Sequence, residues 1–459
     1  MKEKVLVGLD IGTSGLKITL ADAKGRIKGH LKFEYQNLPE QQVGVVPVSY
    51  YGGIVKQALT KVAARYELLA IAVTTQMYSI CEKTSEGILV WQWNSLVQRS
   101  KDQEKLYGSE LLKSGCPVDT IYGGYKWFAA SEQKRRSFLP YGLKECLIKM
   151  LTGQLVSDYT TASASGWFDL NSMDWNHSFL EKLGCASPEM PKLIRHNEIA
   201  ARVLPEAFEG ASGDTVVVPG LGDGPAASYA CKDVSGFCGN VGTSMACRVF
   251  TSQPDLTKAD EMWIYGVSAQ PKLYIAGGIS SNGCTVFHWG EKMGIERLDL
   301  LRDTGDLMFL PWINGERMPY WSSDLRGTFL GLTTATSKED IACVMQKAVS
   351  FTLATMIKKL EPYKKAKDVL VLAGGGINSQ TILTVTSGCI DSDIAILEDS
   401  DYLCSTGAVI SAGEAVGIAV EPHNKITRII PANQNFKKEL DRWQQAGECL
   451  AELYQKGIL

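Results

Sequence analysis

A chain of 459 residues is long enough for two or three domains, each with its own buried core. Its 47 basic and 50 acidic residues leave a formal charge of -3, so no electrostatic surface for nucleic acid or an anionic membrane is expected. The N-terminus enters a strand pattern without the regions of a signal peptide, and no uninterrupted apolar run of roughly 18 residues occurs, so we expect a soluble cytoplasmic protein with small-molecule or protein partners.

The first predicted element is a strand, turn and strand over residues 5–20, with a second turn at 22–25 and a third strand near 26–33. Glycines in the first turn allow backbone N–H groups to converge on an anion, and a carboxylate, a hydroxyl and an ammonium beside them suit a phosphate. Because a strand follows, this is neither a Rossmann nor a Walker loop; a flexible hairpin at a sheet edge is the other interpretation. The residues concerned are Asp10, Gly12, Thr13, Ser14, Gly15 and Lys17.

Strand runs at 69–74 and 216–218 alternate with helical patterns at 52–66 and 142–151. This alternation predicts an α/β fold. The last pattern, over residues 435–454, has the composition of a helix with a face of mixed charge, which favours a packing helix over a functional tail.

Asp223 lies where a strand ends and a run of small residues begins a helix. As a general base it would orient a substrate hydroxyl and take its proton during phosphoryl transfer, and the glycines around it would let that hydroxyl approach. The other interpretation is structural, because an Asp before Gly-Pro-Ala is a good helix N-cap.

The second half of the chain repeats the opening pattern. Residues 237–250 predict a strand, a turn and a strand, and the turn again carries Gly242, Thr243 and Ser244. We therefore expect two related domains that face each other across a cleft, each with one phosphate loop, and we place their boundary near residue 232.

A glycine run, Gly374, Gly375 and Gly376, follows a buried strand pattern and is followed by Asn378 and a helical pattern. Such a run permits close approach of a flat ligand or a phosphate to the backbone, although any strand-to-helix turn can use glycines. The small residues over 405–413 predict close helix packing.

The 12 cysteines never occur as C-x-x-C, so we expect reduced, mostly buried thiols and neither a zinc ribbon nor a redox dithiol. The 5 histidines have no candidate nucleophile beside them in the sequence, which gives a histidine-driven mechanism little local support.

In their order along nearly the whole chain, these pieces resemble the FGGY carbohydrate kinase family of the actin-like ATPase superfamily. The combination is specific although each part is not. The matching residues are Asp10, Gly12, Thr13 and Lys17; 151–153, Asp158, Ala162 and Ser163; Gly222 and Asp223; Gly242, Thr243 and Ser244; 315–319, Trp321, Arg326 and Gly327; and 374–376.

The resemblance implies an α/β fold of two actin-like ATPase (ribonuclease H-like) domains flanking a catalytic cleft. Residues 1–232 would form a sugar-binding domain with the first phosphate loop, and residues 233–459 an ATP-binding domain that ends in the packing helix. The implied activity is that of an ATP-dependent kinase, which transfers the terminal phosphate of MgATP to a hydroxyl of a small sugar or sugar acid.

By the same resemblance Asp223 is the catalytic base, and residues 10–17 form the first phosphate loop. Residues 242–244 form the second phosphate loop, and residues 374–378 hold the adenosine half of ATP. Mg²⁺ is expected near Asp10 and Asp223, held largely through water, and domain closure is expected to exclude bulk water.

Specificity is expected from the first domain, where relatives often show Gly-Gln-Met-His-Gly and this chain has Gln76, Met77 and Tyr78. A phenol in place of the imidazole keeps an aromatic face and one polar tip, but it changes which sugar hydroxyl is reached. Trp93 and Asn94 stand where relatives commonly have Trp-x-Asp-x-Arg, although core packing is the other interpretation for the tryptophan.

Loss of that acidic residue makes a sugar acid easier to accept, with Arg99 or Lys126 as counter-ions. Asp158 is a further candidate for the substrate site. Residues 162–175 and 314–327 are more similar to gluconate kinases than to glycerol kinases, which favours gluconate, with a pentulose such as xylulose next.

Glu316 and Arg317, in the Gly-Glu-Arg-x-Pro segment, are expected to brace the second domain rather than to react. A homodimer is one assembly consistent with the resemblance. The other functional classes are a non-catalytic sugar or ATP sensor, an actin-like ATPase acting on protein partners, and a nicotinamide dehydrogenase, which the strand after the opening glycines disfavours.

Overall fold

The computed structural model describes residues 2–35, 44–92, 95, 97–184, 190–398, 400–422 and 424–459. They form two compact units, each assembled from separate segments of the chain. Unit 1 comprises Met1–Lys232, Ser252–Ile275 and Tyr402–His423, and unit 2 comprises Asp233–Thr251, Ala276–Asp401 and Asn424–Leu459. The α/β class that the alternating patterns predict is confirmed.

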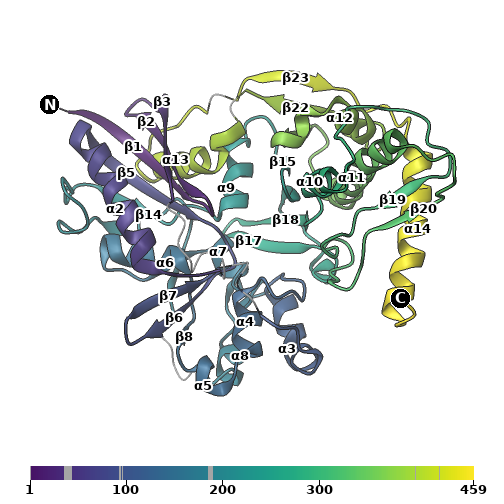
Figure 1. The fold of residues 1–459 in the computed structure, drawn as a ribbon. Helices are drawn as coiled ribbons and strands as arrows, with labels where there is room; N and C mark the ends of the chain where they lie inside the picture. Colours follow the sequence, from purple (N-terminus) through teal and green to yellow (C-terminus); the bar gives the residue numbers. More distant parts are fainter. Residues whose placement is uncertain are drawn as a thin grey trace. The chain divides into compact units, whose positions relative to one another are not determined.

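Unit 1 is built on a six-stranded sheet with the order β13-β14-β5-β1-β2-β3 (Figure 1). β1 and β2 form the predicted antiparallel hairpin, in which Asp10 pairs with Lys17, and β3 is the predicted third strand. β5 runs parallel to both β1 and β14, and β13 runs antiparallel to β14. The strands are β1 (Glu3–Ile11), β2 (Gly15–Asp22), β3 (Ile27–Glu34), β5 (Tyr66–Thr75), β13 (Ala201–Arg202) and β14 (Val216–Val218).

Helices cover both faces of this sheet, because successive side chains along a strand point to opposite faces. α2 (Val48–Arg65) and α6 (Leu143–Thr152) pack on one set of alternating β1 residues, and α13 (Leu403–Ala415) packs on the other set (Figure 1). A Cβ atom at Gly8 of β1 would lie 2.1 Å from the backbone oxygen of Ser405 in α13. The close packing predicted for this small-residue helix is therefore confirmed.

A four-stranded sheet of order β4-β7-β6-β8 and several short elements complete unit 1. They are β4 (Val45–Pro47), β6 (Ile80–Thr84), β7 (Gly87–Trp91), α3 (Lys101–Lys113), α4 (Gly123–Ala129), α5 (Glu132–Arg135), β8 (Phe138–Leu139), β9 (Val156–Asp158), α7 (Tyr159–Ser163), β10 (Phe168–Asp169), β11 (Asp174–Trp175), α8 (His177–Lys182), β12 (Lys192–Ile194), α9 (Asp223–Ala230), η1 (Leu256–Lys258) and β17 (Trp263–Ala269).

Unit 2 repeats the strand topology of unit 1. Its strands follow the order β16-β15-β21-β22-β23, with an antiparallel hairpin, two parallel steps and a last antiparallel strand. In unit 1, β2-β1-β5-β14-β13 show the same order and directions. The repeat seen in the sequence thus corresponds to a repeated topology.

The remaining bounds follow from the chain order, and β18 passes from unit 1 into unit 2. The elements are β15 (Phe237–Val241), β16 (Met245–Thr251), β18 (Lys272–Ser280), α10 (Thr285–Lys292), β19 (Met308–Leu310), β20 (Thr328–Leu330), α11 (Lys338–Leu360), η2 (Glu361–Tyr363), β21 (Leu370–Ala373), η3 (Gly375–Asn378), α12 (Gln380–Ser387), β22 (Ile394–Leu397), η4 (Ser400–Tyr402), β23 (Ile426–Ile430) and α14 (Lys437–Gln455).

One helical segment of the described chain, Lys338–Tyr363, is long and apolar enough to cross a membrane by length and composition alone. Its most apolar window is 89% buried inside the protein, and buried core helices pass the same test. The segment therefore forms part of the core of unit 2.

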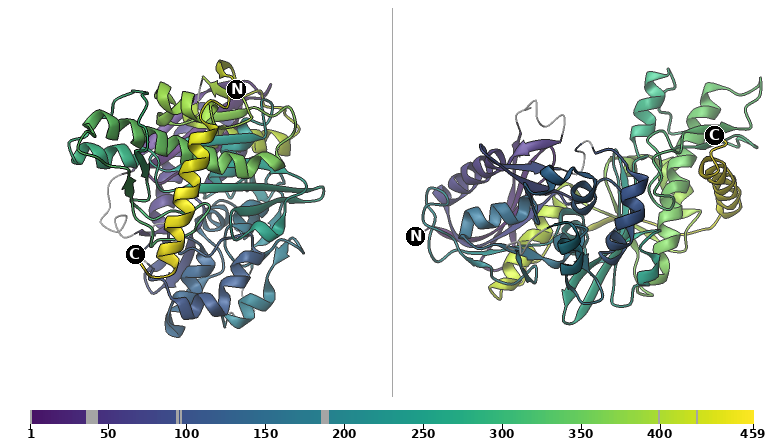
Figure 2. Two further views of the ribbon diagram at one scale, coloured as in Figure 1. Left: turned by 90° about the vertical axis from the view of Figure 1, so that its right-hand side faces the viewer. Right: turned by 90° about the horizontal axis from the view of Figure 1, so that it is seen from below.

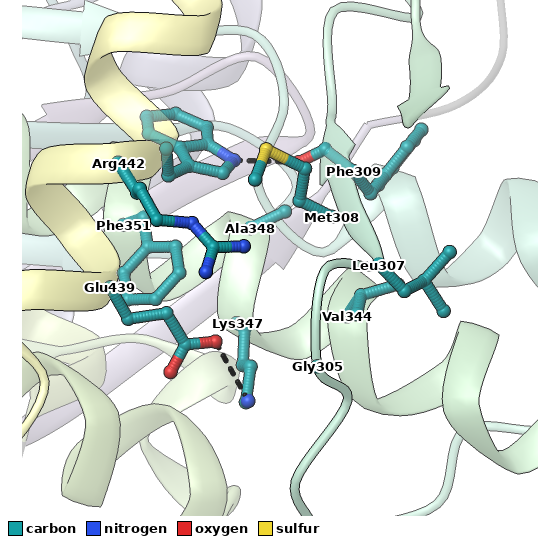
Figure 3. A pocket seen from close by; sticks show the side chains of 11 residues that line it. Gly305, Leu307, Met308, Phe309, Val344, Lys347, Ala348, Phe351, Glu439 and Arg442 are labelled. Atoms are coloured by element: carbon teal, nitrogen blue, oxygen red, sulfur yellow. Dashed lines mark hydrogen bonds and ion pairs between the residues drawn. The ribbon is translucent and has the colours of Figure 1, made fainter. Parts of the chain in front are cut away.

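α14, the long yellow helix in Figure 2, packs on unit 2 through Trp443, whose indole N–H donates to the backbone oxygen of Phe309 at 2.7 Å. Beside it lies a cavity of about 280 Å³, where Lys347 of α11 pairs with Glu439 of α14 at 2.8 Å (Figure 3). Most other lining side chains are apolar. The helix predicted over 435–454 is thus a packing element.

Among the described cysteines, all except Cys404 and Cys449 are buried, and all are free thiols. The expectation of reduced, mostly buried thiols is met for this part of the chain. The Sγ atoms of Cys81 and Cys146 lie 3.5 Å apart, and burial raises the pKa of Cys81 well above its ordinary value, which disfavours the reactive thiolate.

Candidate active site

The β1–β2 hairpin presents the first predicted phosphate loop, with Thr13 and Ser14 exposed at its tip. Its glycines serve the hairpin itself, which differs from the predicted anion cradle. Gly12 donates its N–H to the backbone oxygen of Gly15 at 3.1 Å, and a Cβ atom at Gly15 would lie 2.8 Å from a backbone oxygen of β3. The loop therefore offers hydroxyl groups and a neighbouring ammonium to a phosphate, while the N–H of Gly12 is already used.

Asp10 lies in β1 just before this loop and is only 8% exposed. Burial raises its pKa to about 7, the negative charge of Asp223 adds to the increase, and the ammonium of Lys17 opposes it. Two carboxylates of unit 1 therefore act on each other beside a lysine. A divalent cation would relieve their repulsion.

Asp223 is the first residue of α9 and is half-buried. The N-cap of this helix is Gly222, so the interpretation of Asp223 as an N-cap is wrong by one residue. Its Oδ1 accepts the N–H of Gly224 at 2.8 Å. In the first turn of a helix the carboxylate is stabilised by the positive end of the helix dipole.

A cavity of about 330 Å³ in unit 1 brings together the predicted substrate residues Gln76, Met77 and Tyr78, which follow the end of β5. A Cβ atom at Gly222 would lie 2.5 Å from Sδ of Met77. The cavity therefore borders the start of the helix that carries Asp223. The other lining residues are Thr75, Ser79, Pro140, Tyr141, Gly142, Lys144, Glu145, Thr161, Ala164, Ser165, Trp167 and Trp175.

Two buried polar atoms of the lining residues have no hydrogen-bond partner among the described residues. They are Oε1 of Gln76, a side chain 3% exposed, and Nε1 of Trp167, which is fully buried. A buried acceptor or donor left unpaired costs about 1–3 kcal/mol, so such atoms in a site are usually satisfied by a ligand or by water. The hydroxyls of a polyol both accept and donate, and they suit this pair of atoms.

Tyr78 has a left-handed backbone with φ of 70°, which is unusual for a residue with a side chain. The ammonium of Lys126, 2% exposed, donates to the carbonyl of Tyr78 at 3.2 Å and also to that of Ile121. The Tyr78 ring packs edge-on against Tyr122, with ring centroids 5.3 Å apart. Lys126, predicted as a counter-ion for a sugar acid, therefore holds the backbone that aims Tyr78.

Asp158 is fully buried and forms an ion pair with Lys144, with Nζ and Oδ1 2.6 Å apart. It also caps α7, because its side chain accepts the N–H groups of Thr160 and Thr161. Burial raises the pKa of Asp158, but the ammonium of Lys144 and these hydrogen bonds lower it further, and the net value lies below the ordinary one. We therefore assign Asp158 a supporting role behind the cavity in place of the predicted substrate contact.

The second predicted phosphate loop joins β15 to β16, and Thr243 and Ser244 are exposed in it. The segment before α10 braces this loop. Cys284 donates its N–H to the backbone oxygen of Gly242 at 2.7 Å, and a Cβ atom at Gly283 would lie 2.5 Å from the same oxygen. The turn is thus held by direct backbone contact.

Glu316 anchors this bracing segment, as predicted for the Gly-Glu-Arg-x-Pro motif. Its Oε2 accepts from Ser280 at 3.1 Å and from Asn282 at 3.2 Å. Asn282 immediately precedes the glycine that contacts the second loop. Burial raises the pKa of Glu316 to about 7.

The glycine run of unit 2 lies at the end of β21. Gly374 has φ of 91°, and Cβ atoms at Gly374 and Gly376 would lie 2.5 Å from Oδ1 of Asn240 and 2.2 Å from a side-chain carbon of Val241. These two glycines are required by the end of β15. Gly375 has no atom within 4 Å of a built Cβ and is exposed, as is Asn378, so these two positions are accessible to a ligand.

Two committed substrate candidates, Trp93 and Asn94, lie outside the described residues. Arg99, the other predicted counter-ion, forms an ion pair with Glu104, with Nε and Oε1 2.8 Å apart. Its charge is therefore balanced by a protein carboxylate.

Sequence reasoning did not single out Lys144, Thr160 or Trp167. The Asp-Tyr-Thr-Thr pattern at 158–161 is typical of a helix start capped by Asp, and that signal could have pointed to Thr160. Lys144 and Trp167 stand in apolar or helical stretches, where their partners cannot be identified without the fold.

Within the described residues there is no cluster of three or more His, Cys, Asp or Glu side chains that could hold a metal ion. Asp10 and Asp223 nevertheless fit Mg²⁺, which usually keeps several waters and takes one or two carboxylates together with substrate phosphates. The raised pKa of Asp10 beside a second carboxylate is the observation that supports this fit.

Comparison with known proteins covers nearly the whole chain. The model of the FGGY family of carbohydrate kinases, N-terminal domain, matches residues 5–230, and that of its C-terminal domain matches residues 234–416. The gluconokinase of Bacillus subtilis (strain 168) is 25% identical over 454 residues, which cover 90% of this chain and 88% of that protein. Two solved structures share the fold: gluconate kinase from Lactobacillus acidophilus, with TM-score 0.88, 22% identity and 99% of both chains covered, and a ligand-bound xylulose kinase from the same species, with TM-score 0.84, 22% identity and 99% and 97% covered.

Proposed function

Because the chain belongs to the FGGY family of carbohydrate kinases, we propose that it transfers the terminal phosphate of MgATP to a hydroxyl of gluconate, or else of a pentulose such as xylulose. Kinases of this family use ATP and an alcohol acceptor, so the chain is a phosphotransferase. The names of the similar proteins, a gluconokinase and kinases of gluconate and xylulose, favour these two acceptors.

The observation that carries the proposal is the cavity behind Gln76, Met77 and Tyr78. An unpaired amide oxygen and an unpaired indole N–H among its lining residues suit the hydroxyls of a polyol. The side chain of Met77 lies against Gly222, the residue before Asp223. An acceptor held there would place a hydroxyl close to a carboxylate.

Asp223 is the proposed general base. It would orient the acceptor hydroxyl and take its proton as the bond to phosphorus forms. The first phosphate loop, with Asp10, Thr13, Ser14 and Lys17, would hold the transferred phosphate. Mg²⁺, when bound, would neutralise phosphate charge, and Asp10 and Asp223 would hold it largely through water.

The nucleotide is assigned to unit 2. Residues 242–244 offer exposed hydroxyls to phosphates, and Gly375 and Asn378 offer an accessible surface for the adenosine half. Residues 1–232 would then serve as the sugar-binding domain and residues 233–459 as the ATP-binding domain. A cytoplasmic location, a homodimer and the absence of nucleic-acid and membrane partners complete the proposal.

An ATP-coupled assay over gluconate, xylulose, ribulose, glycerol and sedoheptulose tests the acceptor. We expect turnover on gluconate or a pentulose, whereas turnover on glycerol alone would contradict the proposal. Asp223→Asn tests the base, with loss of sugar-dependent turnover and retained ATP binding as the expected result. Asp22→Asn is the matched control, because this buried carboxylate of unit 1 lies at the far end of β2. Near wild-type turnover of Asp223→Asn would show that the residue serves only the helix.

A further inference from the structure

The segment before Asp223 is held by side chains from three other parts of unit 1. Thr74 donates its hydroxyl to the backbone oxygen of Leu221 at 3.0 Å. Lys144 donates to that of Gly220 at 3.3 Å, and Gly222 donates its own N–H to the hydroxyl of Thr160 at 2.9 Å. Each of residues 220–222 therefore has a specific partner, and Asp223 follows directly.

The hydroxyl of Thr160 has its orientation set by Asp158. Its only proton is donated to Oδ2 of Asp158, so an oxygen lone pair is left for the N–H of Gly222. Asp158 can play this part only as a carboxylate. Its fully buried ion pair with Lys144 keeps it ionised, as the lowered pKa indicates.

We propose that Thr160, oriented by the buried Lys144–Asp158 pair, is a positioning residue for the general base, because it fixes the N-cap of the helix on which Asp223 is the first residue. The inference rests on the proposed role of Asp223. Gly222 is the N-cap of α9, and its backbone sets where the next side chain starts. A shift of the base by about 1 Å can lower a rate by about 100-fold.

The placement of Thr160 separates this role from substrate binding. Its neighbour Thr161 lines the acceptor cavity, whereas Thr160 is fully buried and is not part of the lining. Loss of the Thr160 hydroxyl should therefore lower kcat and leave the KM values for acceptor and MgATP close to those of the wild type. A residue that only stabilised the fold would not produce this split.

The experiment compares Thr160→Val, Thr160→Ala and Thr160→Ser in the full chain, with kcat, both KM values and thermal stability measured for each. We expect the valine and alanine variants to lose at least about 10-fold in kcat, and the serine variant, which keeps the hydroxyl, to stay within about threefold of wild type. Two variants without the hydroxyl are used so that a folding failure of valine leaves alanine to be measured.

Thr215→Val is the matched control. Thr215 is a buried threonine of unit 1 whose hydroxyl donates to the backbone oxygen of Leu68 at 2.8 Å, away from the cavity. We expect a similar loss of stability with unchanged kcat. If Asp223→Asn is inactive while the Thr160 variants keep wild-type kcat, this inference alone is overturned. If Asp223→Asn keeps full turnover, the base assignment and the role of Thr160 both fall.

Discussion

Burial and the negative charge of Asp223 together raise the pKa of Asp10 to about 7, against an ordinary value of 3.8. The folded protein therefore binds the Asp10 proton more tightly than the unfolded chain does. The stability that comes from this difference is fully present below about pH 4 and is lost as the pH rises through about 7. The site thus holds a carboxylate in an unfavourable charged state at neutral pH.

We expect Asp10→Asn to stabilise the protein without nucleotide, with a gain that grows from pH 4 to about 7 and then levels off. At pH 8 the gain should be on the order of 3 kcal/mol, because about three pKa units correspond to that energy. Urea unfolding at a series of pH values measures it. An equal effect of Asp10→Asn at pH 4 and pH 8 would contradict the raised pKa.

Asp22 gives a control of opposite sign. Hydrogen bonds from Arg26, chiefly from its backbone N–H, lower the pKa of Asp22 to about 2. The stability it contributes is present above pH 4 and is lost as the pH falls through about 2, so Asp22→Asn should destabilise the protein at pH 8 and have little effect near pH 2.

A second prediction concerns acceptor specificity. The hydroxyl of Tyr265, on β17 in unit 1, lies 3.2 Å from that of Tyr122 and 3.5 Å from that of Tyr78, which lines the acceptor cavity. We expect Tyr265→Phe to raise the acceptor KM about three- to tenfold, because a hydrogen bond worth about 1 kcal/mol no longer orients Tyr78. The KM for MgATP should not change. Tyr274→Phe, on the following strand, is the control; equal effects of the two variants would reject the idea.

The sequence predicts contiguous features of the site far better than distant ones. Gln76, Met77 and Tyr78 are found in one cavity because they follow one strand, so their common location is a local property. The contact between Thr160 and Gly222 spans 62 positions, and its existence depends on how the chain folds back. No local pattern carries that information.

Glycines show a second limit of sequence reasoning. A pattern such as Gly-x-x-Gly indicates that side chains are excluded, but it does not say by what. At Gly15 the reason is a neighbouring strand, and at Gly374 and Gly376 it is the end of β15; only Gly375 has open space around a built Cβ. The position of the phosphate loops could be predicted, whereas the reason for their glycines could not.

A third prediction concerns the second phosphate loop. Glu316 accepts hydrogen bonds from Ser280 and Asn282, and the segment after Asn282 braces Gly242. We expect Glu316→Ala to weaken ADP binding about tenfold, measured by calorimetry, because one buried polar network worth about 1–3 kcal/mol is lost. Acceptor binding to unit 1 should not change. If Glu316→Ala binds ADP as the wild type does, the motif has no role in holding this loop.

A last prediction uses two helical glycines with opposite surroundings. A Cβ atom at Gly407 of α13 would lie 1.9 Å from the backbone oxygen of Ala226 in α9, the helix that begins at Asp223. Gly53 of α2 is exposed and has no atom within 4 Å of a built Cβ. Gly407→Ala should therefore destabilise the protein by about 1–3 kcal/mol and lower kcat, because α9 must move away from α13. Gly53→Ala should stabilise it by about 0.5–1 kcal/mol, since alanine is the better helix former, and leave kcat unchanged. Urea unfolding and the coupled assay measure both variants, and equal stability of the two would mean that α9 and α13 are not in close contact.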